Sequence, residues 1–428
     1  MKTKSYLKAI GPGLIFASSS IGTSHLVLST RAGAEHGMIY FWIILLALLF
    51  KYPFFEFGPR YAAATGHNLL KGYKDQGVWA IYIFLLLIVI SMFAVTGAIG
   101  AVSAGLLSTI LSTYFDFGLS DGLLTGVVIL VTLLALLTGG YRGLDRIIKV
   151  ISVTLLITAV VAFFAVIGKG PQAPAADFVA PSLLEGAGLT LFIGLIGWMP
   201  TGIEASVMNS IWILKNNETA HIKPTKKQVL FDFNLGYWFT VVTAIIFLII
   251  GAFTIYGTGE QLGDGTTEFS KNLLHTISDN LGSWAFPIIA VAAFGTIYGT
   301  LITVLDAFSR CVTQGFRALK FDVIADSAEQ KSFAKRIFPA VLIIQSLGGF
   351  ALFYFSTSSM ITMLEWATII SFLIAPILGV LNLRVILKLQ RETDHQVPKY
   401  LLYLAYIGLV AMVGFTIYYL INIGSTGH

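Results

Sequence analysis

Apolar stretches of about twenty residues or more recur from one end of the chain to the other, and this pattern limits the fold most. A helix needs about 20 apolar residues to cross the roughly 30 Å hydrocarbon core of a bilayer. Of the 428 residues, 56% are hydrophobic and only 11% are charged, whereas about 25% of the residues of a soluble domain are charged. The sequence therefore predicts a polytopic membrane protein and excludes a soluble enzyme domain.

We expect an all-α bundle of eleven membrane-spanning helices. Runs such as 81–90 lack the period-two alternation of a membrane-barrel strand. No cleavable signal peptide is expected, because residues 11–30 run into the first span without a small-residue cleavage site. The helices are predicted near residues 10–31, 38–64, 78–112, 120–140, 147–168, 187–214, 231–257, 283–310, 337–356, 359–388 and 400–423.

Lysine and arginine are distributed unequally between alternate loops. If the N-terminus is cytoplasmic, 22 of the 27 fall on the cytoplasmic side, and only Arg31, Lys169 and Lys271 fall on the outer side. Cytoplasmic loops carry the excess of positive charge, so we expect an inner-membrane protein with its N-terminus inside and its C-terminus outside. The expected partners are the lipid bilayer and a small ion or solute. Because the basic residues are dispersed among loops, nucleic-acid binding is not expected.

The composition also argues against several kinds of chemistry. The single cysteine, Cys311, can form neither an intrachain disulfide nor a multi-cysteine metal site. The chain has no Gly-x4-Gly-Lys-Ser/Thr loop for ATP and no pair of histidines spaced i, i+4. We therefore expect a secondary transporter that is not an enzyme and carries no cofactor.

Two of the expected spans contain helix-breaking residues. The first span has a polar stretch at 17–25, and the sixth has Pro200 and three glycines within 194–204. Each is the first helix of a five-helix half, at about 10–168 and 187–388, and an odd number of spans makes the halves antiparallel. Paired broken helices indicate an inverted-repeat transporter with a substrate site near the membrane midplane. With the extra helix at about 400–423, the chain is expected to form a single domain, 1–428.

Five short motifs occur in an order and spacing shared with a known family. They are Gly11-Pro12-Gly13, Ala32–Gly37, Ala64–Leu70, Gly140–Asp145 and Met199-Pro200. In these motifs, from about residue 8 to about residue 385, the chain resembles the Nramp family of proton-coupled divalent-metal transporters. The resemblance implies the leucine-transporter (LeuT) fold, with two inverted five-helix repeats plus an eleventh helix. It also implies alternating access and a metal site between helices 1 and 6.

The chain departs from this family where the family binds metal and carries protons. Gly22-Thr23-Ser24-His25 stands where the family has Asp-Pro-Gly-Asn, and Thr201 stands where it has histidine after Met-Pro. The family's acids in helices 3 and 4 fall on Gly97 and Leu133. Of the family's side-chain ligands, only Met199 is retained.

Candidate substrate-binding residues lie at the two helix breaks. Three of them, His25, Met199 and Glu204, are candidate metal ligands. Nitrogen and sulfur donors favour metals such as Mn or Fe over Mg and Ca, and Glu204 would replace the missing aspartate about one turn after Pro200. The full set is Gly22, Thr23, Ser24, His25, Trp198, Met199, Thr201 and Glu204.

Acids inside membrane helices are functional candidates because a buried charge is costly there. We interpret Glu204, Asp306 and Glu365 as candidates for ion coupling. Glu56, which lies near Lys51 and Arg60 in the second span, is interpreted as part of a structural ion pair.

Hydroxyl groups offer a second kind of ion site. Ser18–Ser20, facing Thr300 or Thr303, would suit sodium, although small polar residues also serve as packing contacts between membrane helices. The sequence leaves proton coupling, sodium coupling and no coupling open.

Three functions are consistent with these features. The first is a secondary transporter of a divalent metal ion. The second is a LeuT-fold transporter of a small organic solute, which suits the uncharged serines and threonines of the first break. The third, a sensor or scaffold, is disfavoured because the chain contains no soluble domain.

Overall fold

The computed structural model describes residues 11–115, 118–139, 141–221, 223–263, 265–321, 327–356, 359–393 and 395–422. For residues 141–152 and 220 only the backbone is described. Among the described residues the regular structure is helical throughout. An all-α architecture, as expected from the sequence, is confirmed.

Nine helices run without interruption through the described part of the expected spans. They are α4 (Ile39–Thr65), α6 (Val78–Tyr114), α7 (Asp121–Leu137), α8 (Tyr141–Lys169), α11 (Lys226–Thr254), α13 (Ala285–Lys320), α14 (Ala328–Phe355), α15 (Met360–Glu392) and α16 (Lys399–Asn422). Within the described ranges, seven are long and apolar enough to cross a membrane: α4, α6, α11, α13, α14, α15 and α16. Two short helices, α5 (Leu69–Gln76) and α12 (Thr266–Ser278), connect spans.

The first and sixth spans are both divided, as the sequence predicts. The first consists of α2 (Pro12–Ser20), a π-helix η1 (Ser24–Ser29) and α3 (Thr30–His36). The sixth consists of α9 (Gly186–Trp198) and α10 (Ala205–Ala220). The breaks are shorter than the helix-averse stretches at 17–25 and 194–204: Ser24 and His25 are π-helical, and the second break covers 199–204.

Local sequence signals explain several helix starts. Thr225 and Gln228 form a reciprocal capping box at the start of α11. Ser359 and Asn68 accept backbone N–H bonds at the starts of α15 and α5. Asp232 of α11 accepts bonds from the backbone nitrogens of Gly11 and Gly13, at 3.0 and 2.6 Å. This contact fixes the start of α2 to the seventh span.

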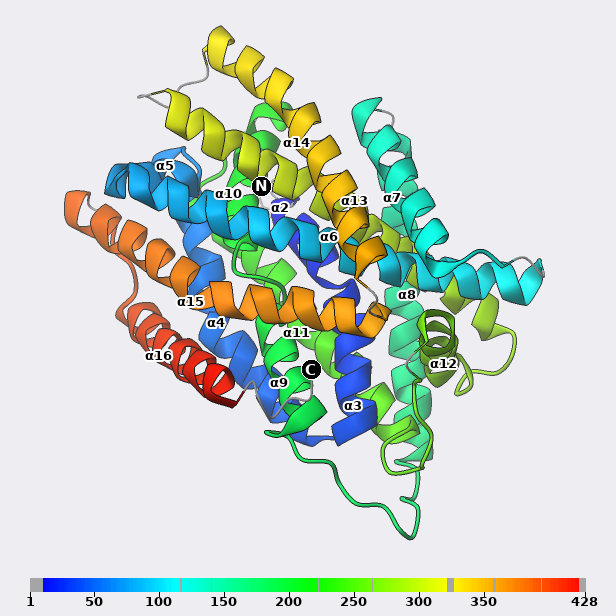
Figure 1. The fold of residues 1–428 in the computed structure, drawn as a ribbon. Helices are drawn as coiled ribbons and strands as arrows, with labels where there is room; N and C mark the ends of the chain where they lie inside the picture. The colour runs from blue at the N-terminus through cyan, green and yellow to red at the C-terminus, as the bar shows by residue number, and fades with distance from the viewer. Residues whose placement is uncertain are drawn as a thin grey trace, which may run out of the picture.

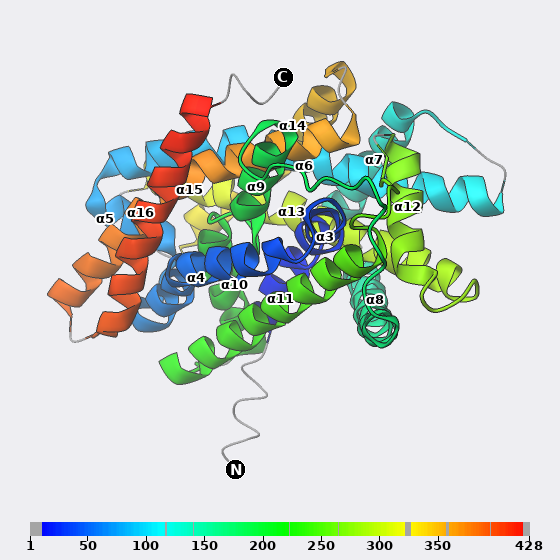
Figure 2. The ribbon, with the colours of Figure 1, turned by 90° about the horizontal axis from the view of Figure 1, so that it is seen from below.

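The divided first span lies inside the bundle. Figures 1 and 2 show α2 and α3 surrounded by longer helices, with α11 packed along both of them and α13 beside α2. Helix α16 lies at the outer edge against α4 and α15 in both views.

The ion pair that the sequence predicts in the second span is present within α4, because Arg60 Nε donates to Glu56 at 2.7 Å.

Candidate functional site

A small cavity lies between the two broken helices and α13. Its volume is about 40 Å³, which is room for an ion with one or two water molecules. Sites for drug-sized organic ligands occupy about 300–1,000 Å³. The polar residues that line it are Ser19, Ser20, Thr23 and Ser24 of the first span, Thr201 and Glu204 of the sixth, and Thr300 and Thr303 of α13.

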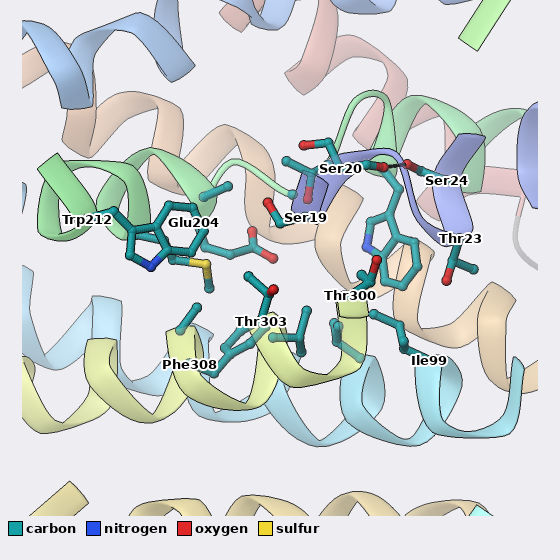
Figure 3. A pocket seen from close by; sticks show the side chains of 18 residues that line it. Ser19, Ser20, Thr23, Ser24, Ile99, Glu204, Trp212, Thr300, Thr303 and Phe308 are labelled. Carbon is teal, nitrogen blue, oxygen red and sulfur yellow. Dashed lines mark hydrogen bonds between the residues drawn. The ribbon is translucent and has the colours of Figure 1, made fainter. Parts of the chain in front are cut away.

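Glu204 occupies the middle of this cavity. Figure 3 shows its carboxylate pointing toward Ser19 and Thr303, with Trp212 at one end of the cavity and Thr23 and Ile99 at the other. The carboxylate lies over Gly202, where an added Cβ would come within 2.2 Å of Oε1. A side chain at position 202 would therefore displace the carboxylate.

Several hydroxyl groups of the cavity present lone pairs rather than protons. Ser19 and Ser20 donate to the carbonyl of Phe16, while Thr300 and Thr303 donate to carbonyls one turn earlier in α13. A hydroxyl has one proton and two acceptor lone pairs. Because these protons are already used, the oxygens that face the cavity are suited to a cation.

Two buried oxygens of the cavity have no hydrogen-bond partner among the described residues. They are Oε2 of Glu204 and Oγ1 of Thr23. Buried polar atoms are nearly always paired, so an unpaired carboxylate oxygen and an unpaired hydroxyl that line one cavity indicate a place for a ligand. Within the described chain, the cavity included, no three His, Cys, Asp or Glu residues gather in a way that could hold a metal.

Ser24 connects the two breaks directly. Its hydroxyl lies 2.6 Å from the carbonyl oxygen of Ser20 and 2.9 Å from that of Pro200 in the sixth span. The same oxygen lies 2.7 Å from Nδ1 of His25, whose Nε2 is 3.1 Å from the carbonyl oxygen of Thr240. A carbonyl only accepts, so Nε2 carries a proton and the imidazole joins α11 to the first break.

Five of the eight residues predicted to bind substrate line the cavity: Thr23, Ser24, Trp198, Thr201 and Glu204. The other three, Gly22, His25 and Met199, are absent from its lining. His25 and Met199 are fully buried, and a Cβ on Gly22 would lie 2.2 Å from Oγ1 of Thr300. In this structure the three residues hold packing and hydrogen-bonding positions outside the cavity lining, and their part in substrate binding stays a prediction.

Sequence reasoning missed Met208 and Trp212, which also line the cavity. Both follow Glu204 on α10 at intervals of four residues, so the three side chains share one helix face. The spacing was visible in the sequence, but only the tertiary structure shows that this face turns toward the cavity.

The other two coupling candidates form ion pairs outside the cavity. Asp306 binds Arg310, one turn along α13, at 2.6 Å. Glu365 of α15 binds Arg31 of α3 at 2.9 Å, and Arg31 also binds Glu35 at 2.6 Å. Glu204 is thus the acid that the described structure brings to the helix breaks.

A second, larger hollow adjoins the cavity. It has a volume of about 410 Å³, and Trp212 contributes to the lining of both spaces. Its charged lining includes Lys215, Arg310 and Lys331. The indole of Trp212 therefore stands between the small cavity and a wider opening.

The sequence matches a family model over nearly its whole length. Residues 13–422 match the model described as natural resistance-associated macrophage protein-like, Nramp. The chain is 34% identical to an uncharacterized protein of Pasteurella multocida, over 96% of this chain and 92% of that one. It is 25% identical to a divalent metal cation transporter, MntH, of Staphylococcus saprophyticus, over 73% of this chain and 70% of that one.

Solved transporters share the fold at low sequence identity. The manganese transporter of Eremococcus coleocola has a TM-score of 0.60 at 15% identity, covering 99% of this chain and 96% of that one. MhsT, solved in complex with L-phenylalanine, has a TM-score of 0.56 at 12% identity, covering 95% of this chain and 98% of that one. The expected LeuT-type fold is confirmed.

Proposed function

The chain belongs to the Nramp family, and from this membership we propose that it is a secondary transporter of a divalent metal ion. The ion binds in the cavity between the two broken helices and α13, and it crosses the membrane by alternating access. The manganese and divalent-metal transport named for its relatives supports this class of substrate. We place the protein in the inner membrane with its N-terminus in the cytoplasm.

The observation that carries the proposal is the chemistry of the cavity lining. One buried carboxylate stands among hydroxyl oxygens whose protons are used elsewhere. Such a set of oxygen donors, with a thioether from Met208, suits a cation of the Mn²⁺ type. The volume of about 40 Å³ favours an ion over an organic solute in this conformation.

Proton coupling, in this proposal, rests on Glu204. A charged carboxylate with an unpaired oxygen is costly to bury, so the empty cavity favours the protonated acid. A bound cation favours the carboxylate, and the proton leaves as the metal enters. Asp306 and Glu365 already have arginine partners, and we assign them no part in this exchange.

The route to the cytoplasm passes Trp212. In the proposed cycle, α10 shifts so that the indole opens the cavity to the adjoining hollow of about 410 Å³. The Ser24 hydroxyl bond to the carbonyl of Pro200 holds the two breaks together while the ion is enclosed.

The direct test measures Mn²⁺ binding and uptake with Glu204→Gln in proteoliposomes. We expect Mn²⁺ affinity to fall roughly tenfold or more, because the variant removes the one negative charge of the cavity, and we expect uptake-linked proton movement to disappear. Glu185→Gln is the matched control, since Glu185 is exposed at the other end of the sixth span. Equal Mn²⁺ affinity and equal proton movement in Glu204→Gln and the parent would contradict the assignment.

The same preparation separates the metal from an organic substrate. Amino acids and other small polar solutes are added as competitors and as labelled substrates. Uptake of such a solute, together with no measurable Mn²⁺ binding by the parent protein, would contradict the proposed metal substrate. It would show instead that the protein transports an organic solute.

A further inference from the structure

The side chain of Lys51 in α4 reaches into the break of the sixth span. Its ammonium nitrogen donates to the carbonyl oxygens of Ile196, Gly197 and Thr201, at 3.0, 2.8 and 2.9 Å. An ammonium group has three protons, and three carbonyls accept them. Only 1% of the residue is exposed, so bulk solvent does not reach this arrangement.

The positions of these carbonyls explain why a cation is needed there. The last four carbonyl groups of a helix have no N–H partner within the helix, and Ile196 and Gly197 lie in the last turn of α9. This end of the helix also carries the negative pole of the helix dipole. Thr201 adds a third carbonyl from the unwound segment, whose own backbone pairing is interrupted.

Two further groups act on the charge of Lys51, and one of them is the Glu204 carboxylate, which attracts the ammonium group. The ammonium nitrogen also lies 5.6 Å from the centre of the Phe55 ring, one turn along α4, which adds a cation–π contact. A buried charge inside a membrane protein is expensive unless it is compensated. Here the direct partners are three backbone carbonyls, with the Glu204 carboxylate as the nearby opposite charge. The three carbonyls form a cage of the type that holds a free cation at broken helices in transporters.

We infer that the carbonyls of Ile196, Gly197 and Thr201 form a monovalent-cation site, and that the ammonium group of Lys51 is its permanently tethered occupant. The side chain supplies from α4 the charge that a free sodium ion would otherwise supply. The sixth-span break therefore keeps its shape without a dissolved ion.

The tethered ammonium also separates two cation positions. The backbone oxygen of Thr201 accepts a hydrogen bond from Lys51, and Thr201 lines the cavity together with Glu204. The transported ion thus binds on the cavity side, while Lys51 holds the carbonyls of α9. Only the uptake measurement below rests on the proposed metal transport, because the stability measurement does not depend on the substrate.

Chemical rescue of Lys51→Ala tests this inference. The full-length variant is purified and reconstituted with choline as the only monovalent cation, then with ammonium, methylammonium, sodium or potassium. We expect uptake to fall roughly tenfold or more in choline, because the buried carbonyls lose their partner. A small cation that enters the vacated space should restore a substantial part of the uptake and raise the unfolding temperature of the variant more than that of the parent.

Two further variants sharpen the result. Lys51→Met fills the space without a charge, so small cations should not rescue it. Lys74→Ala is the matched control, because Lys74 also donates to a backbone carbonyl, that of Phe321, but it does so from the short helix α5. Its uptake and stability should not depend on the monovalent cation.

Four outcomes would overturn the inference. They are full activity of Lys51→Ala in choline, a folded Lys51→Ala protein that no cation stabilises, a variant that cannot be obtained folded even in ammonium, and equal rescue of Lys51→Met. If the parent takes up no metal but ammonium still stabilises Lys51→Ala selectively, the proposed transport function fails and the cation site stands.

Discussion

Met208 brings a sulfur donor to the cavity, one helical turn after Glu204 on the same face of α10. Met199, the methionine at the position that the family motif marks, is fully buried outside the cavity lining. Thioethers prefer softer metals, whereas Mg²⁺ and Ca²⁺ prefer oxygen. The metal preference of this chain is therefore expected to depend on Met208.

Replacing Met208 with leucine should change selectivity without loosening the packing. Leucine has nearly the volume of methionine, and such exchanges usually cost little stability. We expect Met208→Leu to lower Mn²⁺ affinity about tenfold, a loss of about 1.4 kcal/mol, and to leave weak Mg²⁺ binding unchanged. Calorimetric titration of both ions measures the effect.

Met199→Leu provides the matched comparison, because it removes a thioether that does not face the cavity. Its Mn²⁺ affinity should equal that of the parent. A loss of Mn²⁺ affinity in Met199→Leu but not in Met208→Leu would reverse the assignment of the sulfur ligand.

The divided first span depends on close contact with α11. A Cβ on Gly13 would lie 2.0 Å from the carbonyl oxygen of Asp232, and one on Gly236 would lie 2.0 Å from that of Gly13. The same pattern recurs further along the span, where a Cβ on Gly251 would lie 2.1 Å from the carbonyl oxygen of Thr30. Small residues let membrane helices approach closely, and here they place the serines of α2 against the cavity.

Gly236→Leu should therefore push α2 away from α11. Overpacking of a close contact costs about 1–3 kcal/mol, and we expect a lower unfolding temperature together with weaker Mn²⁺ binding. Gly414→Leu in α16 is the control, because a Cβ there meets no atom within 4 Å. If the two variants had the same unfolding temperature, the glycine contact would not be needed to position α2.

The ends of the helices show how far hydropathy alone predicts the secondary structure. The sequence predicts the eighth span at 283–310 and the ninth at 337–356, whereas α13 extends to Lys320 and α14 begins at Ala328. Hydropathy falls where polar residues begin, but backbone hydrogen bonds continue a helix regardless of side-chain polarity. The apolar core of each span is thus predictable, and its polar ends are not.

At the scale of the whole molecule, the distribution of lysine and arginine predicts the orientation of the chain in the membrane, and cysteine labelling can test it. Cys311 is fully buried, so Cys311→Ala gives a background without a reactive thiol. In this background we expect Asp177→Cys, in the exposed connection between α8 and α9, to react with an impermeant maleimide added outside intact cells. Lys215→Cys, exposed in the last two turns of α10, should react only when the inner face is accessible, and the opposite pattern would invert the topology.

The sequence by itself determined the membrane class, the spans and the two breaks, because each follows from the local cost of placing a residue type in hydrocarbon. It also placed Thr23, Ser24 and Glu204 correctly at the cavity, since all three lie within or next to a break. The repeat boundaries, the membrane orientation and the metal itself remain predictions of the sequence.

Only the tertiary structure decided which side chains meet. His25 bonds to Thr240, 215 residues away, and Lys51 reaches carbonyls at least 145 residues away. No local pattern encodes such contacts, because they depend on how the helices pack and rotate against one another. Helix rotation turned Met208 toward the cavity and left Met199 outside its lining, and no spacing rule applied to residues 199–208 alone could have chosen between them.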